Sequence, residues 1–199
     1  SDTWDVDDRI RLNVMYGADH QSIDRMACLH LAAPIAPSLT VKPPSMTVLA
    51  DHFGDPLTRE AVSSLWPDGW DEDDYADASD DGELVLTTTY GATVSYAGKR
   101  GKASLRSVSL HGNRDLEFTQ WRGELPGGLT FDDSPETLFA KFAELPAHQH
   151  DDTLSGYAVW HLPDYTVHVL YSNLYNRLLR VSVIAPGTWK SVRDLDDFA

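Results

Sequence analysis

Three pairs of alternating apolar segments recur along the chain, and this repetition constrains the possible fold more than any other feature. The pairs span residues 9–16 and 26–31, 90–96 and 105–110, and 165–171 and 178–183. The first segment of each pair ends at a tyrosine, which is Tyr16, Tyr96 or Tyr171. Because side chains of a β-strand alternate between its two faces, each pair predicts a β-hairpin. A unit that recurs three times is more typical of a scaffold that presents a binding surface than of a protein built around one catalytic site.

A helix is predicted before the second and the third hairpin. Ser134 is a good N-cap, and Pro135 suits the first helical position because its missing N–H costs nothing there. Thr58 takes the same place before the second hairpin. Apolar residues follow both caps at helical spacing, Leu138, Phe139 and Phe142 in one case and Val62 and Trp66 in the other. The later helix is expected to run for about three turns, near the average helix length.

These elements together predict an α+β fold built from tandem repeats of a helix packed on an antiparallel, hairpin-based β-sheet. An extended segment before each hairpin, 83–89 and 156–161, supplies a third strand, and the sheet is either one extended sheet or two adjoining ones. Residues 1–46 form a partial N-terminal repeat that ends in a proline-rich join. Residues 47–113 form the second repeat, and residues 114–199 form the third repeat with an acidic tail.

The composition limits the classes of partner. The 199-residue chain carries a formal charge of −15 and has a pI of about 4.7. This charge opposes binding to nucleic acid and attracts a basic partner, although an acidic surface can also serve solubility alone.

A single cysteine allows no intramolecular disulfide, so a cytoplasmic location is favoured, with a periplasmic one as the alternative. No stretch has the roughly 20 apolar residues that span a membrane. Whether a leader or earlier segment precedes Ser1 stays open.

The third unit resembles a known bacterial repeat. Its Leu-Pro-Gly-Gly-Leu-Thr-Phe lead-in at 125–131, its Ser-Pro-Glu helix start at 134–136, Trp160 and the hairpin that ends at Tyr171 resemble the SmpA/BamE-like and β-lactamase-inhibitor-protein-like repeat. The unit is also similar to those of immunity proteins that neutralise toxins of contact-dependent or type VI secretion systems. The resemblance covers residues 47 to 187 and implies a helical segment on a small antiparallel sheet.

The departures from these families favour the immunity class. The secreted inhibitors carry disulfides and the outer-membrane assembly proteins carry a lipidated N-terminal cysteine, and this chain shows neither. We therefore expect a non-enzymatic immunity protein that occludes the active site of a cognate, basic toxin. An SmpA/BamE-like envelope assembly or scaffold protein is the alternative, and a hydrolase is a third option. The chain lacks a Gly-x-Ser-x-Gly elbow and a phosphate loop, so no catalytic residue and no cofactor are predicted.

The acidic stretch from Asp68 to Glu83 is the strongest local signal. It holds nine carboxylates and no lysine or arginine. We expect it to be a connecting loop that docks a basic protein, with aromatic anchors between the charges. The predicted partner-binding residues are Trp70, Asp71, Glu72, Asp73, Asp74, Tyr75, Asp77, Asp80 and Asp81. A solvated loop without a partner is the alternative, and a calcium site at Asp71, Asp73 and Asp77 is weaker still, because the glycine and glutamate of the EF-hand are missing.

Residues 148–152, His-Gln-His-Asp-Asp, form a second polar segment. Adjacent histidines can ligate a metal, but a zinc site needs three or four ligands that the fold brings together, and no distant partner is evident. We therefore predict a polar loop, no metal site, and a second candidate contact region.

Overall fold

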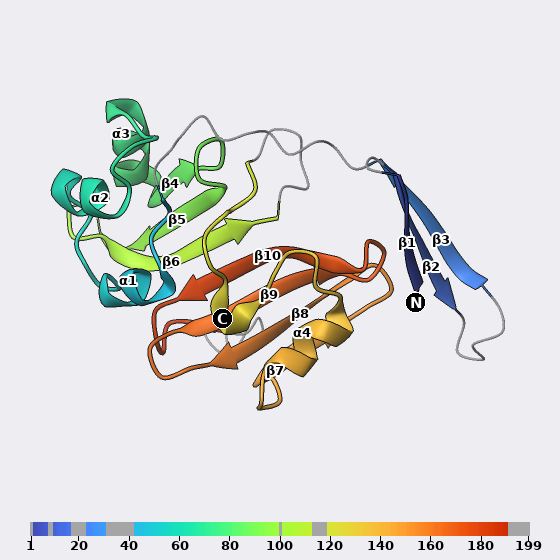
Figure 1. Ribbon diagram of the computed structural model, residues 1–199. Coiled ribbons are helices and arrows are strands. Elements are labelled where there is room, and N and C mark those ends of the chain that lie inside the picture. Colours follow the sequence, from blue (N-terminus) through green and yellow to red (C-terminus); the bar gives the residue numbers. More distant parts are fainter. Residues whose placement is uncertain are drawn as a thin grey trace.

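The computed structural model describes residues 2–7, 10–16, 23–30, 42–99, 101–112 and 119–190, which form two antiparallel sheets and four α-helices. The smaller sheet has the order β1-β2-β3, with β1 (Asp2–Asp7), β2 (Ile10–Tyr16) and β3 (Ile23–His30). The larger has the order β4-β5-β6-β10-β9-β8-β7, and Figure 1 shows its strands side by side. Its strands are β4 (Glu83–Leu86), β5 (Ala92–Ala97), β6 (Ser104–His111), β7 (His148–Asp151), β8 (Ser155–His161), β9 (Thr166–Ser172) and β10 (Arg177–Ile184).

The predicted α+β class is confirmed by these elements, and so are the three hairpins, which are β2–β3, β5–β6 and β9–β10. The extended segments before the later hairpins form β4 and β8. Strand β7 occupies residues that were expected to be a loop, and that expectation is wrong. Its residues pair with β8 from His148 opposite Val159 to Asp151 opposite Gly156, so the polar side chains lie along an edge strand of the sheet.

All three hairpins contain the same irregularity beside a tyrosine that is the last or the last but one residue of their first strand. One extra residue on the second strand interrupts the register, which is the pattern of a β-bulge. The extra residue is Asp24, Arg106 or Leu179. The register steps are Met15↔Arg25 to Tyr16↔Ile23, Ser95↔Ser107 to Tyr96↔Leu105, and Leu170↔Arg180 to Tyr171↔Leu178.

Side-chain caps start the helices α1 (Met46–Asp51), α2 (Arg59–Leu65) and α4 (Pro135–Lys141). The predicted caps are confirmed: the Thr58 hydroxyl accepts from the Ala61 amide at 3.1 Å, and the Ser134 hydroxyl accepts from the Thr137 amide at 3.2 Å. Helix α4 has seven residues and is shorter than predicted, because Phe142 leaves the helical region with φ −102° and ψ 131°.

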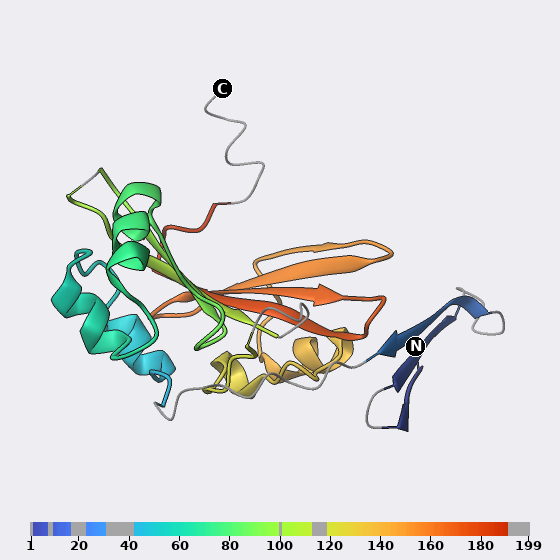
Figure 2. The ribbon, with the colours of Figure 1, turned by 90° about the horizontal axis from the view of Figure 1, so that it is seen from above.

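The helices cover one face of the seven-stranded sheet, and the core lies between the two layers. Figure 2 shows α4 along one side of β8–β10. In strands β4, β5, β6, β8, β9 and β10, alternate residues point into this layer, and those that are fully buried include Leu84, Val94, Val108, Val181, Val167 and Ala158. Leu49, Val62 and Leu138 close it from the helices and are also 0% exposed. Burial of each such Leu or Val side chain contributes roughly 1.5–3 kcal/mol.

The three-stranded sheet lies apart from the larger sheet in both ribbon views (Figures 1 and 2). Ile23 and Met26 of β3 are 59% and 61% exposed. The predicted proline-rich join at 33–37 and the acidic tail at 191–199 lie outside the described residues. Among the helices that are described, none has the length and apolar character needed to cross a membrane.

Candidate functional site

The acidic stretch forms a helix, so the prediction of a connecting loop there is wrong. Helix α3 (Glu72–Asp81) begins at a reciprocal capping box. The Asp71 carboxylate accepts from the amides of Asp73 and Asp74 at 2.9 and 3.0 Å, and the Asp74 carboxylate accepts from the Asp71 amide at 2.9 Å. These bonds satisfy amide groups that a helix start otherwise leaves unpaired. Carboxylates in the first turn are also stabilised by the positive end of the helix dipole.

Gly82 ends the helix in the left-handed conformation, with φ 76°. An added Cβ would lie 2.7 Å from the backbone oxygen of Tyr96, so glycine is required by both conformation and space. Ala78 is fully buried, which fixes the helix face that packs toward β4.

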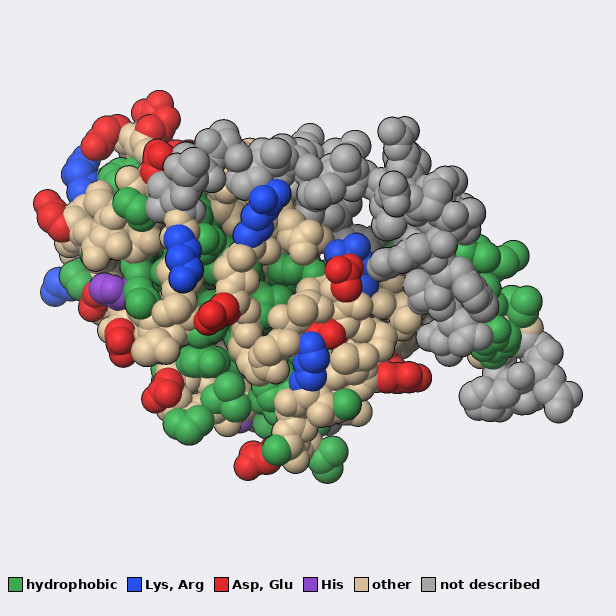
Figure 3. Space-filling model, viewed as in Figure 1, with side chains coloured by type: hydrophobic (Ala, Val, Ile, Leu, Met, Phe, Trp, Pro, Cys, Tyr) green, Lys and Arg blue, Asp and Glu red, His purple; other side chains and the backbone are tan. Residues whose placement is uncertain are grey.

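Four exposed carboxylates lie along a second face of α3. Asp73, Asp77, Asp80 and Asp81 stand at positions i, i+4, i+7 and i+8, so they lie along one face of the helix. We call these four residues the acidic stripe. Figure 3 shows acidic side chains gathered over α3, at the upper left of the view. In the part of the chain that the structure describes, the carboxylates of Asp73, Asp77 and Asp81 make no hydrogen bond or ion pair.

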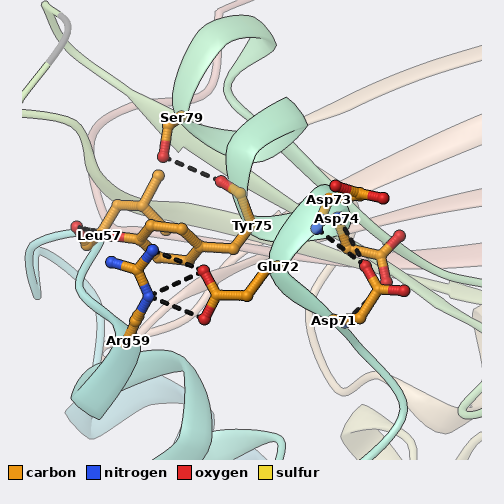
Figure 4. Close-up of polar contacts among 8 residues, drawn as sticks. All are labelled: Leu57, Arg59, Asp71, Glu72, Asp73, Asp74, Tyr75 and Ser79. Carbon is orange, nitrogen blue, oxygen red and sulfur yellow. Dashed lines mark hydrogen bonds and ion pairs between the residues drawn. The ribbon is translucent and has the colours of Figure 1, made fainter.

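Glu72, by contrast, already has a cationic partner. Its carboxylate pairs in a bidentate manner with Arg59 at the start of α2, with Nε 3.0 Å from each oxygen (Figure 4). The hydrogen bond from Arg59 holds the pKa of Glu72 below its usual value. Both side chains are exposed, so this pair contributes little stability. It joins the N-terminal ends of α2 and α3.

The two predicted aromatic anchors are half-buried parts of the scaffold. The Trp70 indole donates to the backbone oxygen of Trp66 at 2.8 Å, and the Tyr75 hydroxyl donates to the backbone oxygen of Leu57 at 3.3 Å. The two rings contact each other with centroids 6.1 Å apart, and the Arg59 guanidinium lies 4.4 Å from the centre of the Tyr75 ring. These contacts fix α3 on the body of the molecule, and they leave only part of each ring accessible.

The nine predicted residues are therefore brought together on one surface but divide by role. Asp71 and Asp74 cap the helix, and Glu72 pairs with Arg59. Trp70 and Tyr75 are half-buried against the body of the molecule. The acidic stripe faces solvent.

The second polar segment, at 148–152, is held within the sheet. Asp151 accepts from the Tyr171 hydroxyl at 3.3 Å and from the Asn173 side-chain amide at 2.6 Å. Asp152 accepts from the backbone amides of Leu154 and Ser155, and these bonds lower its pKa. Across the described ranges, no three His, Cys, Asp or Glu side chains come together as a metal site.

An apolar hollow beside the end of α4 was not predicted. It encloses about 370 Å³ and is lined by residues 142–145 and 147 and by residues 160–162. Phe142 stacks on Trp160 in its wall, with ring centroids 4.2 Å apart, and Leu145 at its rim is 92% exposed. The sequence signal was weak, because Leu145 stands alone between Glu144 and Pro146 and continues no apolar period.

Comparison with known proteins gives no assignment: the chain matches no protein-family model, no curated protein and no solved structure.

Proposed function

We propose that this protein is a non-enzymatic inhibitor of the immunity-protein class, which binds a basic bacterial toxin and blocks its active site. The observation that carries the proposal is the acidic stripe. Its four carboxylates are exposed on a helix that the capping box, the Arg59–Glu72 pair and the Trp70–Tyr75 contact hold in place. A charged surface on a rigid element loses little freedom when a partner binds.

The energetics of α3 favour a cationic partner. Like charges at i and i+4 destabilise a helix by a few tenths of a kcal/mol, and Asp80 and Asp81 lie at its negative end. Arg or Lys side chains of a partner relieve both effects. The net charge of −15 also steers a basic protein toward this chain before contact is made.

We further propose that the fold consists of three copies of one three-stranded unit, as in the β-lactamase-inhibitor-protein-like and SmpA-like repeats. The β-bulge beside each of Tyr16, Tyr96 and Tyr171 supports this proposal, because an irregularity of register at the same position is not required by a generic hairpin. The pairing of β6 with β10 supports it as well. That contact is symmetric about Ser109 and Ser182, each of which lies three residues after its bulge residue, Arg106 or Leu179.

The test is binding of the product of an adjacent toxin or effector gene, measured as Kd at several salt concentrations. The variant Asp73→Asn/Asp77→Asn/Asp81→Asn removes three charges of the stripe and leaves the capping box intact. Each exposed ion pair contributes about 0.2–1 kcal/mol, so the loss of three should weaken binding roughly 3- to 150-fold and give a shallower salt dependence.

A matched control removes three exposed carboxylates elsewhere, in Glu124→Gln/Glu144→Gln/Asp164→Asn. It has the same net charge as the first variant, so it separates local contact from general attraction. Equal Kd values for the two variants would exclude the acidic stripe as the contact. Absence of any binding or protection from the adjacent effector would reject the inhibitor class.

A further inference from the structure

Strand β3 presents an unusually long edge. In the described part of the chain, β3 pairs with β2 alone, and the three-stranded sheet ends there. β3 has eight residues, as do β6 and β10 at the centre of the larger sheet. The strands at the two outer edges of that sheet, β4 and β7, have only four residues each. Proteins keep free edges short because an open strand is a template for pairing, so β3 has the length of a paired central strand.

The contact between β6 and β10 indicates how such a strand pairs. The two run antiparallel with Ser109 opposite Ser182, Val108 opposite Val183 and Ser107 opposite Ile184. Because Ser109 and Ser182 both lie three residues after a bulge residue, a pseudo-two-fold axis passes between them. Their hydroxyl oxygens are 2.9 Å apart. In β3 the bulge residue is Asp24, and the residue three positions later is Ala27.

We propose that β3 pairs with β3 of a second copy of this chain, antiparallel and about a two-fold axis at Ala27, to give a six-stranded sheet across a homodimer. The inference rests on the equivalence of the three units proposed above. The occupant is a second copy because β6 and β10, the equivalent strands of this chain, are already paired on both edges. Such a two-fold contact is closed and uses the same surface on both copies.

The register of this contact follows from the template. Ala27 lies opposite Ala27 of the second copy, Met26 lies opposite Cys28, and Arg25 lies opposite Leu29. The contact also places Met26, which is 61% exposed in the single chain, beside the second copy. Removal of such surface from water favours association.

The hydrogen-bond pattern fixes the spacing at the axis. The Ala185 amide donates to the Arg106 oxygen at 2.8 Å, and the Gly112 amide donates to the Leu179 oxygen at 3.0 Å. Hydrogen-bonded pairs alternate with non-hydrogen-bonded ones, so Ser109 and Ser182 form a non-hydrogen-bonded pair. The two Ala27 residues occupy the same kind of position, where Cα atoms lie about 4.5 Å apart, and a disulfide can span that distance.

Cysteine cross-linking of the full chain tests both the contact and its register. In a Cys28→Ala background, Ala27→Cys should form a disulfide-linked dimer under mild oxidation. Arg25→Cys alone and Leu29→Cys alone should not, because each residue is about 14 Å from the same residue of the second copy, four residues along the strand at 3.4 Å per residue. A mixture of these two variants should cross-link, because positions 25 and 29 lie opposite each other.

The unmodified chain should sediment as a dimer. Met26→Pro should raise the dissociation constant of that dimer at least tenfold, because the amide of Met26 faces the second copy in this register. A monomer at every concentration would overturn the proposal. A dimer that Ala27→Cys does not cross-link, or that Met26→Pro does not weaken, uses another surface and would overturn it equally. Binding of a basic partner through α3 does not involve β3, so loss of one property without the other tells the two proposals apart.

Discussion

Two alanine substitutions on α3 should change the stability of the protein in opposite directions. Asp71→Ala removes the carboxylate that accepts from the amides of Asp73 and Asp74 at 2.9 and 3.0 Å. Loss of an N-cap of this kind costs about 1–2 kcal/mol. Asp81→Ala removes an exposed negative charge from the negative end of the helix. It also ends the repulsion between Asp81 and Asp77. With the higher helix propensity of alanine, this variant should gain about 0.5–1 kcal/mol.

Urea unfolding followed by tryptophan fluorescence measures both changes in the free energy of unfolding. In 0.5 M NaCl the electrostatic part of the Asp81→Ala gain should shrink, because salt screens exposed charges, while the loss in Asp71→Ala should persist. Destabilisation of similar size in both variants would refute the reasoning, since it would mean that position along the helix does not decide the effect of these carboxylates.

Three further predictions concern the sheet and the end of α3. Burial, and secondly the charge of Arg180, lower the pKa of His168 to about 4. The protein should therefore lose stability as pH falls from 6.5 toward 4, by up to about 1.4 kcal/mol per pH unit. In urea titrations at several pH values, His168→Gln should reduce this dependence on pH. Burial and a neighbouring carboxylate raise the pKa of Tyr171 to about 12; stability should fall as pH rises from 10 to 12, and Tyr171→Phe should reduce that fall in thermal unfolding. Gly82→Ala places a Cβ 2.7 Å from the Tyr96 oxygen at a left-handed position and should lower the free energy of unfolding by at least about 1 kcal/mol, as measured by chemical denaturation.

The local elements could be predicted from the sequence because their signals are local. Alternation of apolar residues located the hairpins, and the hydroxyls of Thr58 and Ser134 located the starts of α2 and α4. In each case the residues that determine the element lie within a few positions of one another. Side-chain spacing alone was therefore sufficient.

The helix at the candidate site was missed because charge density was given more weight than capping. Repulsion among carboxylates costs a few tenths of a kcal/mol per pair, while the Asp71–Asp74 capping box, the Gly82 terminus and the burial of Ala78 each contribute about as much or more. The signal was present as an Asp-x-x-Asp spacing followed ten residues later by Asp-Gly. A helix at that position makes the candidate site a rigid stripe of carboxylates, whereas a loop would not.

The pairing of β6 with β10 could not be predicted, because nothing near either strand in the sequence specifies a neighbour more than 60 residues away along the chain. The register between distant strands follows from the need to place the apolar residues of both strands on the face of the sheet that the helices bury. The apolar hollow beside Trp160 depends on the same long-range packing. Both features emerge only when the two halves of the sheet are joined.

Amide hydrogen exchange of the full chain, with and without its basic partner, tests the role of α3 most directly. The account predicts slower exchange in α3 on binding, and loss of that protection as salt is raised. Protection confined to other surfaces, with the amides of residues 72–81 unchanged in a saturated complex, would contradict it.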